Sequence, residues 1–132
     1  MFDTLIVEDN SVFRKSLAEM LRDRFREMRI KEAAGGAQAE SMISEQVPEL
    51  IFMDVRLSDE SGLELTQRIK KTNHTTTIII LTTHDLEEYR EAARLYGADY
   101  FMAKGSSSSQ EIIDLVESIL SNQAGFDNDS LP

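Results

Sequence analysis

The stretch Leu50-Ile51-Phe52-Met53-Asp54-Val55 places a carboxylate at the end of an uninterrupted apolar run. A second apolar run, Ile78-Ile79-Ile80-Leu81, is followed by two threonines. Neither run alternates apolar with polar residues, so both predict central strands of a parallel sheet that is covered on both faces. With three shorter runs that favour strands, the expected set is Thr4–Val7, Ile30–Ala33, Leu50–Val55, Thr77–Thr82 and Tyr100–Ala103.

Longer segments with apolar residues every three or four positions follow each of these strands. The first is expected to begin with Ser11 as its N-cap and to extend its apolar face to Met28. The others are expected near residues 37–47, 63–71, 86–96 and 108–121, with Gly97 ending the fourth. Strand and helix alternate five times, which predicts a doubly wound α/β fold with a parallel sheet and helices on both of its faces.

The composition is that of one globular domain, because the chain has 132 residues and 41% of them are hydrophobic. Residues 122–132 lose the apolar periodicity, so we expect a domain over residues 1–121 followed by a polar tail or the start of a linker. The net charge of -10 argues against direct binding of nucleic acid or of an anionic membrane surface. The absence of cysteine excludes disulfides, thiolate zinc sites and a cysteine nucleophile.

Targeting signals are not evident in the sequence. The first residues, Met1 to Thr4, lack the basic and apolar segments of a signal peptide. The longest apolar runs are also far too short to span a bilayer. We therefore expect a cytoplasmic protein without a membrane partner.

Charged and hydroxyl side chains follow four of the five expected strands. Glu8 and Asp9 follow the first strand, Asp54 lies near the end of the third, Thr82 ends the fourth and Lys104 follows the fifth. In an open parallel sheet, chemistry collects outside the carboxyl ends of the strands. Clustered carboxylates repel one another, and a divalent cation would relieve that repulsion. Because all the ligands are oxygen atoms, the sequence predicts Mg²⁺.

A magnesium ion on one side of this site and the ammonium of Lys104 on the other would suit a phosphoryl group, whose oxygens share negative charge. A carboxylate can accept a phosphoryl group, and Asp54 on the central strand is the best-placed acceptor. The hydroxyl of Thr82 is placed to bond a phosphoryl oxygen. The simpler interpretation of each residue alone is a helix cap or a solvated loop.

The ordered set of motifs resembles the receiver domain of two-component response regulators, the CheY-like family. The matching segments are Leu5-Ile6-Val7-Glu8-Asp9-Asn10, Leu50-Ile51-Phe52-Met53-Asp54-Val55, Gly62 with Leu65, Ile79-Ile80-Leu81-Thr82, Gly97-Ala98-Asp99-Tyr100-Phe101 and Lys104. The resemblance covers about residues 3 to 121 and implies a sheet of strand order 2-1-3-4-5 with five helices. It also implies that the chain is no enzyme in the usual sense, although it catalyses its own phosphorylation and dephosphorylation.

The resemblance assigns a role to each matching residue. Asp54 would accept a phosphoryl group from a histidine kinase or phosphotransfer protein, and Lys104 would pair with that group. The metal ligands would be Glu8, Asp9, Asp54 and the backbone carbonyl of Arg56. Thr82 and Phe101 would be the switch residues, whose movement changes the surface that controls an output. The resemblance also suggests a monomer that dimerises on phosphorylation.

Two departures from the family pattern bear on the output. The family commonly has proline where this chain has Ser58 and Gly105. A non-proline residue after the lysine is typical of receivers joined to a helix-turn-helix output domain, the LuxR/NarL type. We therefore expect control of transcription through a domain absent from this chain. The alternatives are a stand-alone receiver that acts by binding a protein, and a receiver-like interaction module that is not phosphorylated.

Three loop residues next to the site are candidates for tuning dephosphorylation. Arg56 and His84 each lie two residues past a site residue, and Thr83 is larger than the usual residue after the switch hydroxyl. The hypothesis is that Arg56 and Thr83 lengthen the phosphorylated state. The alternative is that all three are ordinary loop residues. A phosphatase of the haloacid-dehalogenase type is disfavoured because it needs a second aspartate where Arg56 stands.

Overall fold

The computed structural model describes residues 2–129 of the chain, and the side chains of residues 2–122. Its sheet is parallel throughout, with the order β2-β1-β3-β4-β5. The strands are β1 (Phe2–Val7), β2 (Met28–Ala33), β3 (Leu50–Met53), β4 (Thr77–Thr82) and β5 (Tyr100–Ala103). The expected strands and their order are confirmed.

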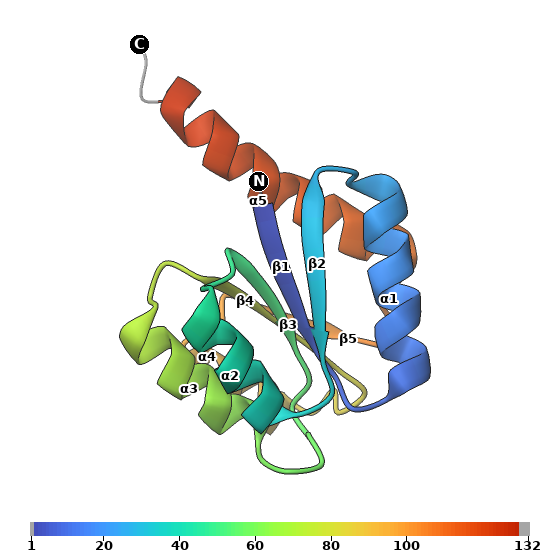
Figure 1. Cartoon of the computed structure of the whole chain (residues 1–132). Helices are drawn as coiled ribbons and strands as arrows, with labels where there is room; N and C mark the ends of the chain where they lie inside the picture. Colours follow the sequence, from blue (N-terminus) through green and yellow to red (C-terminus); the bar gives the residue numbers. More distant parts are fainter. Residues whose placement is uncertain (1, 130–132) are drawn as a thin grey trace.

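Five helices alternate with these strands: α1 (Ser11–Arg24), α2 (Gly36–Glu45), α3 (Gly62–Thr72), α4 (Glu87–Leu95) and α5 (Ser109–Asp129). Helices α1 and α5 lie on one face of the sheet, and α2, α3 and α4 lie on the other (Figure 1). This arrangement confirms the doubly wound α/β fold. Among residues 2–129, no helix combines the length and the apolar composition needed to cross a bilayer.

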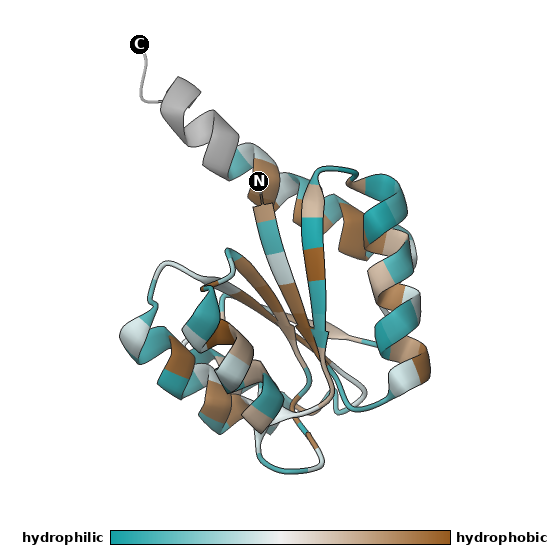
Figure 2. Ribbon diagram, in the orientation of Figure 1, coloured by the Kyte–Doolittle hydropathy of each residue, from teal (hydrophilic) through white to brown (hydrophobic). Residues whose placement is uncertain are grey.

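The sheet separates two apolar cores. Along β3, Ile51 and Met53 pack toward α2, α3 and α4, whereas Leu50 and Phe52 pack toward α1 and α5. All four side chains are at most 1% exposed. Figure 2 shows the apolar residues concentrated along the central strands. The uninterrupted apolar sequence of β3 is therefore explained by burial on both faces.

The structure corrects three details of the expected helices. The N-cap of α1 is Asn10 rather than Ser11, because the Asn10 side chain accepts a hydrogen bond from the Phe13 amide at 3.0 Å. Helix α1 ends at Arg24, and Met28 belongs to β2. Helix α5 extends beyond residue 121 to Asp129, because no proline interrupts its backbone hydrogen bonds. The last three residues of the expected tail, 130–132, lie outside the described part of the chain.

A carboxylate from the β3–α3 loop caps the start of α2. Asp59 accepts hydrogen bonds from the backbone amides of Gly36 at 2.9 Å and Ala37 at 3.0 Å. These bonds lower the pKa of Asp59 below its ordinary value of 3.8, and the Gly36 amide makes the largest contribution. Because the folded chain holds this carboxylate ionised, its contribution to stability is present above the unfolded pKa and is lost as the pH falls.

We expect Asp59→Asn to lower the free energy of unfolding at about pH 6 but to change it little at about pH 3, where the wild-type carboxylate is also becoming protonated. Urea denaturation of both proteins across this range measures the difference. Ser58→Ala, at the exposed neighbouring position, serves as the control. A wild-type advantage that stays constant from about pH 6 to about pH 3 would contradict the role of the ionised carboxylate.

Candidate functional site

The parallel ladder places the candidate residues at one edge of the sheet. Glu8, Asp54 and Lys104 are each the first residue after a strand: β1, β3 and β5. The Asp54 amide donates to the Val7 carbonyl at 3.2 Å, and the Lys104 amide donates to the Thr82 carbonyl at 2.8 Å. Because these bonds continue the pairing beyond the strand ends, the side chains begin from fixed backbone positions.

Three carboxylates meet at this edge. Oxygen atoms of Glu8, Asp9 and Asp54 all lie within 4.8 Å of one another. Glu8 is 3% exposed and Asp54 is 8% exposed, whereas Asp9 is exposed to solvent. The predicted acidic cluster is thus brought together, with two of its three members buried. Like charges at such separations repel, and burial removes the water that would screen them.

Lys104 supplies positive charge to this cluster. Its ammonium forms an ion pair with Glu8 and lies 3.3 Å from Oδ2 of Asp54. The same nitrogen lies 4.4 Å from the ring centroid of Phe13, a distance typical of a cation–π contact. The spacing of apolar residues in α1 does not indicate this contact, because Lys104 follows a different element, β5.

The electrostatics of the site show that one lysine does not fully compensate the carboxylates. Burial raises the pKa of Glu8 above its ordinary value, and the nearby Asp54 charge adds to this rise. The hydrogen bond from Lys104 opposes it but does not outweigh it. An additional cation at this position would favour the ionised form of Glu8.

The residues present fit a hard divalent cation. Oδ1 of Asp54 is buried and has no hydrogen-bond partner within the part of the chain that the structure describes. Such an oxygen needs a partner that is neither protein nor bulk solvent. The cluster offers only oxygen atoms, which are the ligands that Mg²⁺ and Ca²⁺ prefer. Glu8, Asp9 and Asp54 are therefore the side chains that could hold a metal ion.

The predicted switch hydroxyl is fully buried at the end of β4. Thr82 Oγ1 accepts a hydrogen bond from the His84 amide at 3.2 Å and lies 3.3 Å from Nδ1 of the His84 ring. Thr83, the neighbouring tuning candidate, is exposed. Of these two tuning candidates, His84 therefore has the side-chain contact with Thr82.

Phe101, the second predicted switch residue, lies on β5 and packs against the core that contains Ile80 and Ala93. It is half-buried, and the Arg90 guanidinium lies 4.6 Å from its ring centroid. Arg90 is itself paired with Asp85 at 2.7 Å, in the loop before α4. Nothing in the local sequence of α4 indicates this contact of Arg90 with a residue of β5.

Arg56 is exposed, and its side chain turns toward α4. Its guanidinium donates a hydrogen bond to the Tyr89 hydroxyl at 3.0 Å. This bond raises the pKa of Arg56 above its ordinary value. The local sequence of α4 does not indicate this contact, because the Tyr89 hydroxyl meets a residue of a different loop.

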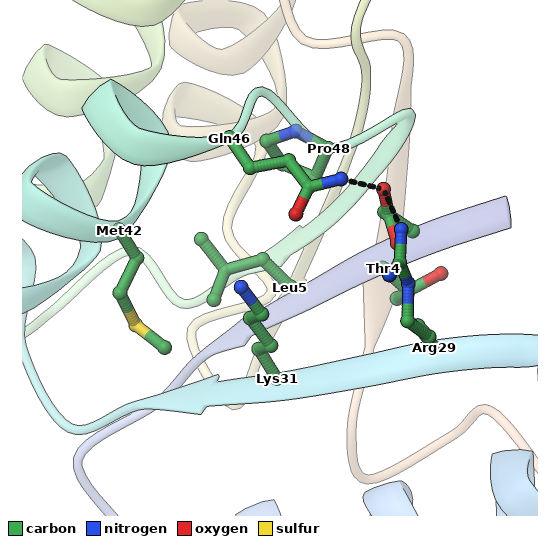
Figure 3. Close-up of a pocket in the computed structure, with 8 residues that line it drawn as sticks. Thr4, Leu5, Arg29, Lys31, Met42, Gln46 and Pro48 are labelled. Atoms are coloured by element: carbon green, nitrogen blue, oxygen red, sulfur yellow. Dashed lines mark hydrogen bonds and ion pairs between the residues drawn. The ribbon is translucent and has the colours of Figure 1, made fainter. Parts of the chain in front are cut away.

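A separate cavity at the opposite end of the sheet lies between β1, β2 and α2 (Figure 3). Gln46 and Arg29 both bond the carboxylate of Asp3 at its rim, at 2.8 and 2.7 Å. Thr4 Oγ1 lines this cavity and has no hydrogen-bond partner among the described residues. The volume of about 20 Å³ accommodates a water molecule but not a cofactor. The cluster of Glu8, Asp9 and Asp54 is therefore the better candidate for a functional site.

Comparison with known proteins agrees with this geometry. Residues 4–117 match the family model of the response regulator receiver domain. The transcriptional regulatory protein YdfI of Bacillus subtilis is 34% identical over 82% of this chain and 50% of its own length. The chemotaxis protein CheY of Halobacterium salinarum is 30% identical over 88% of this chain and 94% of its own length.

Solved structures give the same result. A two-component response regulator of the LuxR family from Aurantimonas sp. superposes with a TM-score of 0.80 at 26% identity, covering 91% of this chain and 85% of that one. The chain spans only 35% and 50% of the length of the first two curated relatives that it matches. The matched region begins within β1 and ends within α5. The chain therefore belongs to the response regulator receiver domains of two-component systems.

Proposed function

We propose that Asp54 is the phosphoacceptor of this receiver domain and that it works with Mg²⁺. The observation that supports this most directly is the buried Asp54 carboxylate. One of its oxygens faces the Lys104 ammonium and the other has no partner within the described residues. Glu8, Asp9 and Asp54 would hold the metal ion, together with the backbone carbonyl of Arg56 that the family resemblance indicates. The ion would supply positive charge next to the transferred group.

The phosphoryl transfer forms one bond to phosphorus and breaks another. A carboxylate oxygen of Asp54 attacks phosphorus, and the bond from phosphorus to the imidazole nitrogen of the kinase breaks. The imidazole leaves with the electron pair of that bond and takes up a proton. Hydrolysis later breaks the new phosphorus–oxygen bond, so water yields inorganic phosphate and restores Asp54. The chain thus promotes its own phosphorylation and dephosphorylation without acting on a separate metabolite.

The other site residues respond to the new charge. A phosphoryl group adds negative charge and strong acceptor oxygens where Lys104 already lies. The Lys104 ammonium exchanges part of its contact with Glu8 for a phosphoryl oxygen. Thr82 rotates its hydroxyl toward the same group, and Phe101 moves inward. We propose that Arg56, Thr83 and His84 tune the lifetime of this state, with Arg56 and Thr83 lengthening it.

The output that we propose is control of transcription through a domain beyond this chain. This is supported by the match to YdfI, a transcriptional regulatory protein of which the chain spans half the length. The alternative is a receiver that acts alone by protein binding, and the 94% coverage of CheY favours it. In either case we propose that this protein is cytoplasmic, that its partner is a histidine kinase or phosphotransfer protein, and that it dimerises on phosphorylation.

The test is the intact mass of the chain after incubation with acetyl phosphate. We expect the wild-type protein to gain one phosphoryl unit in the presence of Mg²⁺, and to gain none when Mg²⁺ is chelated. Asp54→Asn should gain none under either condition, because an amide oxygen is a poor nucleophile. Asp59→Asn, an exposed carboxylate in the following loop, is the matched control and should be modified like the wild type. A gain that persists in Asp54→Asn would contradict the assignment.

A further inference from the structure

The side chain of Arg56 is bound to α4 rather than to the acidic site. Arg56 follows the acceptor by two residues, and its guanidinium donates to the Tyr89 hydroxyl at 3.0 Å. The Arg56 side chain is exposed, and Tyr89 is half-buried. The only cation in direct contact with Asp54, within the described residues, is therefore Lys104.

Tyr89 also contacts the other side of the site. Its ring meets the His84 ring edge-on, with the centroids 5.8 Å apart and the planes inclined by 68°. His84 in turn contacts Thr82 through both its ring and its amide. Tyr89 thus lies between the loop that follows the acceptor and the loop that follows the switch hydroxyl.

In the phosphorylated protein, Arg56 has two alternative acceptors, the Tyr89 hydroxyl and the phosphoryl group on Asp54. The bond to Tyr89 is the weaker of the two. A phenol oxygen is a neutral acceptor, whereas a phosphoryl group is a charged one. A guanidinium can pair with a phosphoryl group through two parallel hydrogen bonds and an opposite charge, whereas a phenol oxygen accepts one hydrogen bond and carries no opposite charge. Phosphorylation of Asp54 would therefore draw Arg56 from Tyr89, at the cost of the existing bond.

We propose that Tyr89 is a positioning residue that holds Arg56 away from Asp54 in the unphosphorylated protein and so opposes the phosphorylated state. This inference rests on the proposed function and names a regulator of the same site. The Tyr89 hydroxyl and the phosphoryl group compete for one guanidinium. Removing the hydroxyl therefore favours the phosphorylated state, whereas removing the guanidinium disfavours it.

The test uses beryllium fluoride, a stable analogue of the phosphoryl group, titrated at fixed Mg²⁺ and followed by ¹⁹F NMR. Tyr89→Phe should lower the half-saturating concentration about two- to tenfold, the range expected for one hydrogen bond. Arg56→Ala should raise it. The half-life of the aspartyl phosphate, measured by intact mass, should lengthen in Tyr89→Phe and shorten in Arg56→Ala. A purely structural role for this contact predicts changes of the same sign in both variants.

Two further variants complete the design. Tyr96→Phe removes a hydroxyl from the C-cap of the same helix and should behave as the wild type. The double variant Arg56→Ala/Tyr89→Phe should match Arg56→Ala alone. The thermal midpoint should agree among the wild type, Tyr89→Phe and Tyr96→Phe.

Two results are decisive against the inference. If Tyr89→Phe behaves as the wild type, or keeps its effect when Arg56 is absent, competition for the guanidinium is overturned. If the wild-type protein itself neither binds beryllium fluoride nor gains a phosphoryl unit, the proposed function fails and the inference fails with it. The behaviour of the wild type thus separates the two failures.

Discussion

Gly62→Ala is expected to lower the free energy of unfolding by about 3 kcal/mol and to impair phosphorylation. A Cβ at residue 62 would lie 1.8 Å from the backbone carbonyl oxygen of Asp54 and 2.9 Å from its carbonyl carbon. The Gly62 amide also donates to the Val55 carbonyl at 2.7 Å, so the loop has little freedom to retreat. The substitution must therefore displace the backbone of the acceptor itself.

Two other glycines provide matched controls. The three atoms nearest to a Cβ at Gly36 all belong to the Glu60 side chain, and a Cβ at Gly105 would meet nothing within 4 Å. Gly36→Ala and Gly105→Ala should therefore change the free energy of unfolding by less than about 1 kcal/mol. Urea denaturation and the acetyl phosphate assay measure both effects. Equal stability of Gly62→Ala and Gly105→Ala would refute the close contact with Asp54.

Lys104→Met should lower the free energy of unfolding by about 3 to 5 kcal/mol at neutral pH without Mg²⁺. The ammonium is the partner of two buried carboxylates, and its loss leaves their charges uncompensated. Mg²⁺ should restore part of the lost stability, so the ion should raise the thermal midpoint of the variant more than that of the wild type.

The decrease in the free energy of unfolding caused by Lys104→Met should also depend on pH. Burial already raises the pKa of Glu8, and removal of the Lys104 hydrogen bond raises it further. The folded variant then binds a proton more tightly than the unfolded chain, so its stability recovers as the pH falls through the folded pKa. Urea denaturation at about pH 7 and about pH 5 tests this direction.

Lys70→Met is the control, since the Lys70 ammonium pairs with the more exposed Asp99 at 2.9 Å. Its stability should not respond specifically to Mg²⁺. If the stability of Lys104→Met showed the same insensitivity to Mg²⁺, the electrostatic account of the site would be wrong.

The fold could be predicted from the sequence because burial imposes a plain pattern on the central strands. Strands β3 and β4 lie inside the sheet with helices on both faces, and they contain the uninterrupted apolar runs Leu50–Met53 and Ile78–Leu81. The start of α1 was harder to predict, because Asn10 and Ser11 are both good N-caps and the local sequence does not distinguish between them. Met28 continues the spacing of a helix by chance, although it belongs to β2.

The acidic site could be predicted because its residues come directly after the strands. The topology alone then brings Glu8, Asp54 and Lys104 together. The contacts of Phe13 and Tyr89 could not be predicted in this way, because they depend on the direction in which a side chain leaves one helix and meets a different element. Each residue also fits the apolar face of its own helix, so the sequence pattern does not indicate the contact of Phe13 with Lys104 or of Tyr89 with Arg56.

The position of β5 at the edge of the sheet gives the site parts of unequal rigidity. Strand β5 pairs only with β4, and its residues are more exposed than those of β1 and β3. Amide hydrogen exchange should therefore be slowest in β1 and β3 and faster in β5. Glu8 and Asp54 follow two central strands, whereas Phe101 lies on an edge strand and Lys104 follows it. Under the proposed function, the acidic residues would therefore keep their places while Lys104 and Phe101 adjust to the phosphoryl group.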